Sequence, residues 1–274
     1  MSIHAPAPPA ANEEIVFQAP KVMFSKSTHY CPGCHHGTAH RLVAEVIEEM
    51  GLVEKTICAS SIGCSVFIYN YLDIDTIESP HGRAPAVATG LKRARPDRIV
   101  FTYQGDGDLA SIGLAEIMHA ANRGERITVV FVNNTVYGMT GGQMAPTTLL
   151  GQKTTTSPNG RALESDGPPM RMAEIMGALG GVAYSTRVAL DTVAHIRQAK
   201  KAIRRAFEVQ QMDIGLSFVE ILATCPTNWR MDSLAANKRL TEEMIPAFPL
   251  GVYADRTDAA SVVSEKPVEQ KGKH

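Results

Sequence analysis

The stretch YQGDGDLASIGLAEIMHAANRGERITVVFVNN, residues 103–134, holds two acidic residues among glycines, a helical segment, and an apolar run that ends in two asparagines. A first apolar run, RIVFTYQ at residues 98–104, leads into the Gly-Asp-Gly-Asp turn, and a second, ITVVFVNN, occupies residues 127–134. Both runs have the length of a buried strand, and the segment between them, ASIGLAEIMHAANR at 110–123, is helical in character. Strand, helix and strand in this order form the crossover unit of parallel sheets. The stretch therefore predicts an α/β fold.

The rest of the chain continues the alternation of helices and strands. A helix is predicted at residues 38–51, where one side carries an apolar stripe made of Leu42, Val43, Val46, Ile47 and Met50. Further helices are predicted at 84–94, 170–181 and 193–207, and further strands near 55–60, 182–188 and 216–224. This order predicts a three-layer α/β/α fold with a mainly parallel sheet over residues 23–253. An extended Ala- and Pro-rich arm at 1–22 and a flexible tail at 254–274 are expected to flank it.

Composition excludes several classes of function. The 274 residues are 44% hydrophobic, enough for one substantial core, and the formal net charge of −1 comes from charges of both signs spread along the chain. Without a surplus of either sign there is no electrostatic basis for nucleic acid or an anionic membrane as a partner. No run approaches the ~18 apolar residues of a membrane-spanning helix, and the N-terminal residues lack a signal-peptide pattern, so we expect a cytoplasmic protein.

Residues 105–108 and 133–134 come directly after the two strands of the crossover, at the sheet edge where open parallel sheets bind ligands. Asp106 offers a carboxylate and Asn134 an amide oxygen. Together with a main-chain carbonyl these suit Mg²⁺, whose remaining ligands are commonly phosphate oxygens. Gly105 and Gly107 allow the backbone to approach a phosphate, which the N-terminus of the following helix also favours. The two clusters together predict a metal-bridged diphosphate, although either one alone is more typical of a turn or a strand-end cap.

The combination of Gly-Asp-Gly, a crossover and Asn-Asn closely resembles the thiamine diphosphate motif. By that resemblance the cofactor is thiamine diphosphate, and the Mg²⁺ ligands are Asp106, Asn134 and the carbonyl of Val136. Asn133 is then expected to be structural. Asp108 is expected to hold the diphosphate end through its backbone or through an intermediate contact.

Five cysteines occur in a chain expected in a reducing compartment, where thiols more often bind metal or react than form disulfides. Cys31 and Cys34 form a C-x-x-C pair before a helix, a pattern found in zinc sites, redox pairs and iron–sulfur sites. Cys64 and Cys225 each follow a predicted strand, at the same edge as the diphosphate site. A [4Fe–4S] cluster there would give electrons an outlet, whereas a structural zinc ion beside the cofactor lacks a chemical purpose. Cys58 lies within a predicted strand and is expected to be a buried core thiol.

Several motifs occur in the order found in one protein family: CPGCHHG, SIGCS, HGRAPAVATGLK, QGDGD, NNTVYGMTGGQMAPTT and a late CP. From about residue 24 to residue 229, the chain resembles the thiamine-binding β subunit of the 2-oxoacid:ferredoxin oxidoreductases, of the 2-oxoglutarate and branched-chain type. The resemblance implies a thiamine diphosphate-binding fold. It also implies a [4Fe–4S] cluster whose ligands are Cys31, Cys34, Cys64 and Cys225.

The resemblance further implies a CoA-dependent oxidative decarboxylation of a 2-oxoacid to acyl-CoA and CO2, with electrons passing through the cluster to ferredoxin or another acceptor. Val66 and Phe67 stand where some pyruvate-type members carry a lysine, and His35 replaces the family's usual glycine. Because of Val66 and Phe67 we do not expect pyruvate as the main substrate. The resemblance of residues 65–94 to the 2-oxoglutarate and branched-chain members favours 2-oxoglutarate. The chain is expected to be active only with an α subunit that carries the other thiamine domain. Small γ and ferredoxin-like δ subunits are further partners that the resemblance implies.

His81 and Arg83 lie in a Gly- and Pro-framed turn, SPHGRAP at residues 79–85, which the resemblance puts beside the cofactor. His81 is expected to transfer a proton or to hydrogen-bond the substrate, and Arg83 to bind a carboxylate, although a surface loop with a satisfied histidine is the alternative. Thr140 and Gln143 are expected to contact diphosphate or substrate unless their loop is only a Gly-rich turn. The complete set of expected cofactor-binding residues is Gly63, Ser65, His81, Gly105, Asp106, Gly107, Asp108, Asn134, Val136, Gly138 and Thr140.

Three other functions fit parts of this pattern. A branched-chain 2-oxoacid, 3-methyl-2-oxobutanoate, is the alternative substrate within the family. A non-oxidative thiamine-dependent decarboxylase or synthase would need no cysteine quartet, and its holoprotein would be colourless. An electron-transfer module without its own catalysis would hold thiamine and iron yet reduce no acceptor with any 2-oxoacid.

Overall fold

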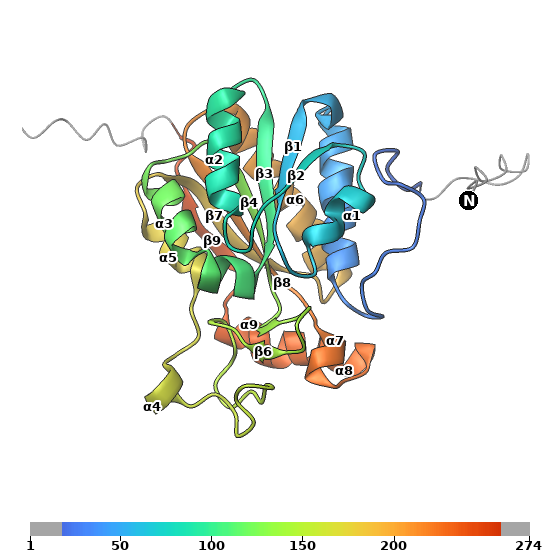
Figure 1. Ribbon diagram of the computed structural model, residues 1–274, viewed down its shortest axis with the longest axis vertical. Coiled ribbons are helices and arrows are strands. Elements are labelled where there is room, and N and C mark those ends of the chain that lie inside the picture. The colour runs from blue at the N-terminus through green and yellow to red at the C-terminus, as the bar shows by residue number, and fades with distance from the viewer. Residues whose placement is uncertain (1–17, 259–274) are drawn as a thin grey trace, which may run out of the picture.

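The structure, a computed structural model, describes residues 18–258. Its central feature is a seven-stranded sheet in the order β2-β1-β3-β4-β8-β7-β9 (Figure 1). All neighbouring strands are parallel except β7 and β9, which are antiparallel, so the prediction of a mainly parallel sheet is confirmed. The strands of the sheet are β1 (Thr56–Ser60), β2 (Asp75–Glu78), β3 (Ile99–Gly105), β4 (Thr128–Asn133), β7 (Val182–Ala189), β8 (Leu216–Leu222) and β9 (Gly251–Asp255).

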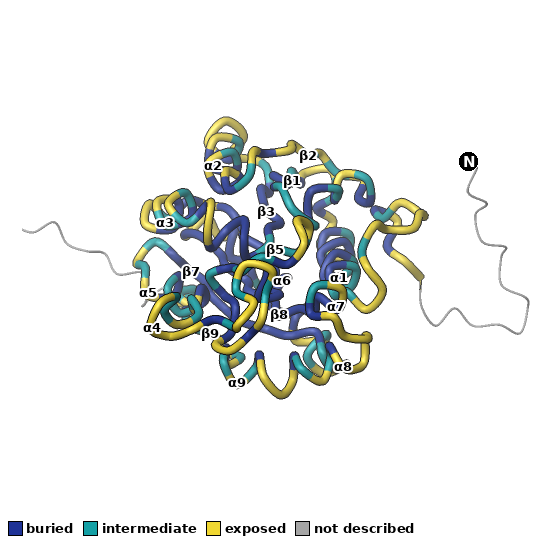
Figure 2. The backbone as a smooth tube through the Cα atoms, turned by 60° about the horizontal axis from the view of Figure 1, so that its bottom comes forward, coloured by how far each residue is buried: buried dark blue, intermediate teal, exposed yellow. Residues whose placement is uncertain are grey.

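Helices cover both faces of the sheet, as the three-layer prediction requires. On one face, α1 (His36–Glu49) and α6 (Val193–Gln211) share a buried apolar cluster with the strands. On the other face, a second cluster is formed with α2 (Ala84–Ala94), α3 (Leu114–Asn122) and α5 (Met172–Ala178). Figure 2 shows the inner strands of the sheet as mostly buried and the outer sides of these helices as exposed. Burial of an apolar stripe on each helix is therefore what holds the layers together.

The parallel register brings the ends of four strands to one edge. Ser60 of β1 pairs with Tyr103 of β3, and Gly105 of β3 pairs with Val132 of β4. Asn133 of β4 in turn pairs with Leu222 of β8. The segments that follow these strands therefore emerge side by side, although they lie far apart in the sequence.

A third apolar cluster lies beyond these strand ends and covers part of the edge. It contains residues from the loop after β4 and from the segment after β8, including Val136, Leu149, Trp229, Leu240 and Phe248. Figure 1 shows the elements of this region together at one end of the sheet. They are β5 (Val136–Tyr137), β6 (Gln143–Met144), α7 (Pro226–Trp229), α8 (Ser233–Arg239), the π-helical turn η4 (Leu240–Met244) and α9 (Ile245–Ala247).

Several features differ from or add to the expected elements. The helix expected at 110–123 is divided at Gly113 into a π-helical turn, η3 (Gly107–Ile112), and α3. Such turns often occur at functional sites. Short elements that the periodicity did not predict are β2, β9, the β5–β6 hairpin, α4 (Leu163–Asp166), α7 to α9, and the 3₁₀ turns η1 (Val53–Lys55) and η2 (Val66–Asn70).

Most of the expected arm at 1–22 and tail at 254–274 lies outside the described residues. Within the described part, Val22 is buried and donates its backbone N–H to Glu48 of α1 at 3.0 Å. Residues 254 and 255 belong to β9. None of the helices within residues 18–258 has both the length and the apolar character needed to cross a bilayer.

Candidate active site

A cavity opens at the edge where β1, β3 and β4 end. Its walls contain every expected cofactor-binding residue except Ser65, whose hydroxyl instead donates to the carbonyl of Ser61 at 3.2 Å. Cys64 also lines the cavity. The sequence did not indicate four of its other wall residues, which are His36, Ile62, Tyr137 and Met139.

Asp106 begins η3 at the end of β3 and is almost completely buried. Its Oδ1 accepts a hydrogen bond from the N–H of Gly107 at 2.9 Å, and its Oδ2 accepts one from the hydroxyl of Thr147 at 2.6 Å. Burial raises the pKa of Asp106 to about 7, although these two donors act in the opposite direction. A cation bound at this position would stabilise the ionised carboxylate.

Asn134, Thr135 and Val136 form the turn that follows β4, and all three are buried. Oδ1 of Asn134 accepts from the N–H of Val136 at 3.3 Å, and the carbonyl of Asn134 accepts from the indole of Trp229 at 3.1 Å. Asp106, Asn134 and Val136 line the same cavity, so the carboxylate and the amide border one space. These oxygen donors fit a small hard cation such as Mg²⁺.

Asp108 is a buried carboxylate that organises the turn carrying His81. Its Oδ1 accepts hydrogen bonds from the hydroxyl of Ser61 at 2.8 Å and the N–H of Gly82 at 2.6 Å, and it also contacts Nδ1 of His81. Its Oδ2 accepts from the amide of Gln104. Asp108 therefore fixes the orientation of the His81 ring, which remains partly exposed and lines the cavity.

Glycines allow two close approaches in this region. A Cβ at Gly82, whose φ is +78°, would lie 2.7 Å from the backbone nitrogen of Gly113, so this turn packs directly on the start of α3. A Cβ at Gly107 would lie 2.4 Å from the ring of Tyr137. Larger residues at these positions would separate the His81 turn and η3 from the loop that follows β4.

Arg83 lies outside the cavity. Its guanidinium pairs with Glu116 of α3, and half of its side chain is exposed. Thr140 lines the cavity, but its hydroxyl donates to Oε1 of Gln143 at 2.6 Å, so the two side chains contact each other.

The four cysteines expected to act together come from three separate loops that meet beside the cavity. Cys31 and Cys34 precede α1, Cys64 follows β1, and Cys225 follows β8. A Cβ at Gly138 would lie 3.3 Å from Sγ of Cys64 and 3.8 Å from Sγ of Cys225. Burial raises the pKa of Cys34 to about 12, and the other three thiols add to this effect.

Burial also raises the pKa of Cys64 to about 12, with Cys225, Cys31 and Asp106 contributing in the same direction. The four thiols are therefore close enough to interact electrostatically, both with one another and with the carboxylate at the strand end. Cys58 lies apart from them, fully buried within β1, as expected for a core thiol.

Hydrogen bonds hold the cysteine loops together. The hydroxyl of Thr224 donates to the carbonyl of Gly33 at 2.7 Å, which ties the loop before α1 to the end of β8. Nδ2 of Asn228 donates to the carbonyl of Gly138 at 2.7 Å and to Sγ of Cys225 at 3.2 Å. A ring nitrogen of His29 bonds the carbonyl of Cys64 at 3.0 Å.

The thiol arrangement can be compared with what a metal centre requires. Within residues 18–258, no three His, Cys, Asp or Glu side chains are close enough to hold a single metal ion. One zinc ion at ~2.3 Å from each sulfur would need the sulfurs within about 4 Å of one another. A four-iron cluster spans a larger volume and is held by four Cys thiolates, which is the donor set that Cys31, Cys34, Cys64 and Cys225 would supply.

Histidine and tyrosine rings near the start of α1 form a cluster that the sequence did not predict. His36 lines the cavity, stacks on Tyr30 with ring centroids 5.2 Å apart, and bonds the hydroxyl of Tyr103 through Nδ1 at 3.1 Å. Burial lowers the pKa of His36 to about 3 and that of His35 to about 4, so both rings are neutral near pH 7. His35 does not line the cavity.

Comparison with known proteins agrees with this geometry. Residues 61–221 match the family described as thiamine pyrophosphate enzyme, C-terminal TPP binding domain. The ketoisovalerate oxidoreductase subunit VorA of Methanothermobacter thermautotrophicus is 51% identical over 231 residues, which are 84% of this chain and 48% of VorA. The 2-oxoglutarate synthase subunit KorB of Archaeoglobus fulgidus is 40% identical over 215 residues, covering 78% of this chain and 76% of KorB. The chain thus spans about half the length of VorA.

A solved structure is also similar. It is the 2-oxoglutarate:ferredoxin oxidoreductase from Magnetococcus marinus with 2-oxoglutarate, coenzyme A and succinyl-CoA bound. The TM-score is 0.69 at 27% sequence identity, and the match covers 89% of this chain and 87% of that one.

Proposed function

The chain belongs to the thiamine pyrophosphate enzymes and, among them, to the 2-oxoacid:ferredoxin oxidoreductase subunits, and on that premise we propose that it is the subunit that binds thiamine diphosphate, Mg²⁺ and a [4Fe–4S] cluster. The reaction proposed is the CoA-dependent oxidative decarboxylation of a 2-oxoacid. One 2-oxoacid and one CoA give acyl-CoA, CO2 and a proton, and two electrons pass through the cluster to ferredoxin or another acceptor. We propose that the complex works in the cytoplasm.

The observation that carries this proposal is that the cavity and the cysteine group share one loop. Asn134 and Val136 begin the loop after β4, and Gly138 of the same loop lies against the sulfurs of Cys64 and Cys225. When bound, thiamine diphosphate supplies the nucleophilic carbon and the electron sink for decarboxylation. A cluster on Cys31, Cys34, Cys64 and Cys225 would then lie next to the place where electrons are released.

The residues of this chain have distinct proposed roles. Asp106, Asn134 and the carbonyl of Val136 hold Mg²⁺, while the backbone at Gly105 and Gly107 approaches the diphosphate. Asp108 contributes by orienting His81, which hydrogen-bonds the substrate or transfers a proton. Arg83 lies outside the cavity and pairs with Glu116, so its role in binding a carboxylate stays a prediction.

The proposed complex contains an α subunit with the other thiamine domain. The relatives are named as subunits, which supports the proposal that partner chains are present. Small γ and ferredoxin-like δ subunits and the electron acceptor complete the proposed set of partners.

Two substrates are proposed. The sequence resemblance favours 2-oxoglutarate, and the similar solved structure contains that substrate. The higher identity to the ketoisovalerate subunit favours 3-methyl-2-oxobutanoate, as do the apolar side chains of Ile62 and Met139 in the cavity wall. An apolar wall suits a branched alkyl group better than a second carboxylate.

The test is an anaerobic assay of the native complex with Mg²⁺, thiamine diphosphate, CoA and a dye acceptor, run against a panel of 2-oxoacids. We expect CoA-dependent dye reduction, with kcat/KM highest for one of the two proposed substrates. A complex that contains thiamine and iron but reduces dye with no 2-oxoacid would contradict the proposal. Aldehyde formation without dye reduction would instead identify a non-oxidative decarboxylase.

A further inference from the structure

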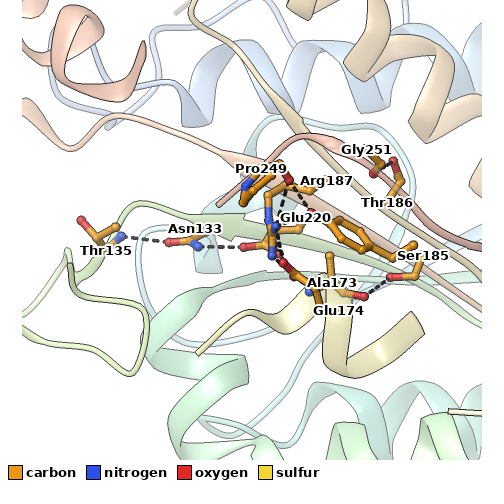
Figure 3. A network of polar contacts seen from close by, with 11 residues as sticks. Asn133, Thr135, Ala173, Glu174, Ser185, Thr186, Arg187, Glu220, Pro249 and Gly251 are labelled. Carbon is orange, nitrogen blue, oxygen red and sulfur yellow. Dashed lines mark hydrogen bonds and ion pairs between the residues drawn. The ribbon is translucent and has the colours of Figure 1, made fainter. Parts of the chain in front are cut away.

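A buried polar network begins beside the loop after β4 and crosses the sheet (Figure 3). Glu220 of β8 lies at its centre and has no exposed surface. Its Oε1 accepts a hydrogen bond from Nδ2 of Asn133 at 2.8 Å. Its Oε2 accepts from Nε of Arg187 at 2.9 Å and from the N–H of Ala173 at 3.0 Å. The guanidinium of Arg187 and the N–H of Ala173 can only donate. Burial raises the pKa of Glu220, but the positive charge of Arg187 acts against this and keeps the carboxylate ionised.

Arg187 supplies the positive charge that Glu220 requires. Its side chain is completely buried, and it also contacts Glu174, the carbonyl of Pro249 at 3.0 Å and the hydroxyl of Tyr253 at 2.8 Å. An unpaired buried charge is strongly destabilising, so these contacts hold Glu220 and Arg187 in one arrangement.

The ionised Glu220 determines which way the amide of Asn133 faces. Because a carboxylate can only accept, Nδ2 must point to Glu220 and Oδ1 must point away from it. Oδ1 then accepts a hydrogen bond from the N–H of Thr135 at 3.1 Å. Figure 3 shows Asn133 between Thr135 and Glu220, joined to both.

Thr135 has an uncommon backbone conformation that needs such support. Its φ is +64°, in the left-handed region, which costs a β-branched residue about 1–3 kcal/mol. Its carbonyl accepts a hydrogen bond from the hydroxyl of Thr148 at 2.6 Å and one from the amide of Gln152 at 3.3 Å. The N–H of Thr135 is held by its hydrogen bond to Oδ1 of Asn133.

We propose that Glu220 is a positioning residue for the metal–diphosphate site and acts through Asn133 on the backbone of Thr135. Thr135 lies between Asn134 and Val136, so its conformation sets the directions of the amide of one and the carbonyl of the other. The inference rests on the proposed function, because it concerns the Mg²⁺ ligands assigned there.

Glu220→Gln tests the relay with almost no change in shape. Arg187 and Ala173 both need an acceptor, so the glutamine oxygen faces them and its amino group faces Asn133. Asn133 must then turn its amide over and loses the bond to Thr135. Mutation of residues that support metal ligands typically lowers metal affinity by about 10- to 100-fold. We therefore expect half-maximal thiamine diphosphate binding to need about 10–100 times more Mg²⁺.

Asn133→Asp in the Glu220→Gln background restores the pattern of donors and acceptors. The aspartate accepts from the glutamine amino group and from the N–H of Thr135, so the Mg²⁺ requirement should return to within a few-fold of wild type. Glu174→Gln is the matched control, because it removes a carboxylate from the other side of Arg187. It should lower Tm without changing the Mg²⁺ requirement.

The measurement uses the complex with its partner subunit, stripped of metal by a chelator. Each variant is incubated with thiamine diphosphate over a Mg²⁺ series and desalted, and the retained cofactor is measured as fluorescent thiochrome. If Glu220→Gln does not assemble, Asn133→Ala carries the same expectation, because it removes the bond to Thr135 directly.

The results separate the inference from the proposed function. A shifted Mg²⁺ requirement that the double variant reverses supports the relay. An unchanged requirement in Glu220→Gln, or an equal shift in Glu174→Gln, overturns the relay while the proposed function stands. A wild-type complex that retains no thiamine diphosphate at any Mg²⁺ concentration overturns both.

Discussion

Nδ2 of Asn228 donates a 3.2 Å hydrogen bond to Sγ of Cys225. The same nitrogen donates to the carbonyl of Gly138 at 2.7 Å, in the loop that follows the proposed Mg²⁺ ligands. One amide therefore joins a proposed cluster ligand to the loop beside the cofactor cavity, and it places a donor on a sulfur.

Replacing that donor should change the reduction potential of the proposed cluster. Hydrogen bonds to cluster sulfurs stabilise the reduced, more negative state. Asn228→Leu removes a bond worth roughly 1 kcal/mol, which corresponds to a decrease of about 40 mV for a one-electron couple. Redox titration followed by EPR measures it. Thr227→Ala, at an exposed neighbouring position, should leave the potential unchanged. A potential that does not fall in Asn228→Leu would contradict this account of the contact.

Gly138→Ala should disturb the cysteine group directly. The added methyl would lie 3.3 Å from Sγ of Cys64, which is closer than ordinary contact, so the sulfur must move. We expect less iron per complex and slower dye reduction, while the assembled complex remains folded. Gly90→Ala is the control, because its Cβ would meet nothing within 4 Å on α2. There the replacement should raise helix stability by up to about 1 kcal/mol. Equal iron content in both variants would show that Gly138 does not lie against the cluster.

His40 should make the folded chain sensitive to mild acid. Burial lowers the pKa of His40 to about 4, from an ordinary value of 6.5, and neither ring nitrogen has a hydrogen-bond partner among the described residues. The unfolded chain therefore binds a proton that the folded chain does not, and stability falls as pH decreases from about 6.5 to about 4. His40 is expected to contribute about 2 kcal/mol to the loss of stability at pH 5, relative to pH 7.5. The buried rings of His35 and His36, whose pKa values are also lowered, add to it.

His40→Leu should reduce the loss of stability at pH 5 by about 2 kcal/mol, while the part that comes from His35 and His36 remains. Stability at pH 7.5 should change little, because no hydrogen bond is broken. Urea unfolding of both proteins at pH 7.5 and pH 5 measures the difference. The same pH dependence in wild type and variant would mean that another group is responsible.

The three layers of the fold could be predicted from the sequence because the helices and strands that form them have a clear hydrophobic periodicity. The helix α1 buries one apolar stripe, and β3 and β4 are continuous apolar runs. The edge strands β2 and β9 are largely exposed and therefore carry little pattern. The segments α7 and α9 are too short to show a helical period.

The same distinction applies to the site. Asp106 and Asn134 could be identified because strand ends in a parallel sheet meet at one edge. The contacts that hold them come from remote positions, such as Thr147 on Asp106, Trp229 on Asn134 and Glu220 on Asn133. No local spacing indicates these partners. The ion pair of Arg83 with Glu116 likewise arises only when α3 packs beside the turn.

Anaerobic reduction of the cluster by substrate tests most directly whether cavity and cysteine group form one electron path. The native complex, loaded with thiamine diphosphate and Mg²⁺, is mixed with a 2-oxoacid and CoA without any external acceptor, and the cluster is followed by visible absorbance and EPR. We predict that the iron–sulfur absorbance bleaches and a reduced-cluster signal appears as CO2 is released. Release of CO2 while the cluster stays oxidised would contradict the account.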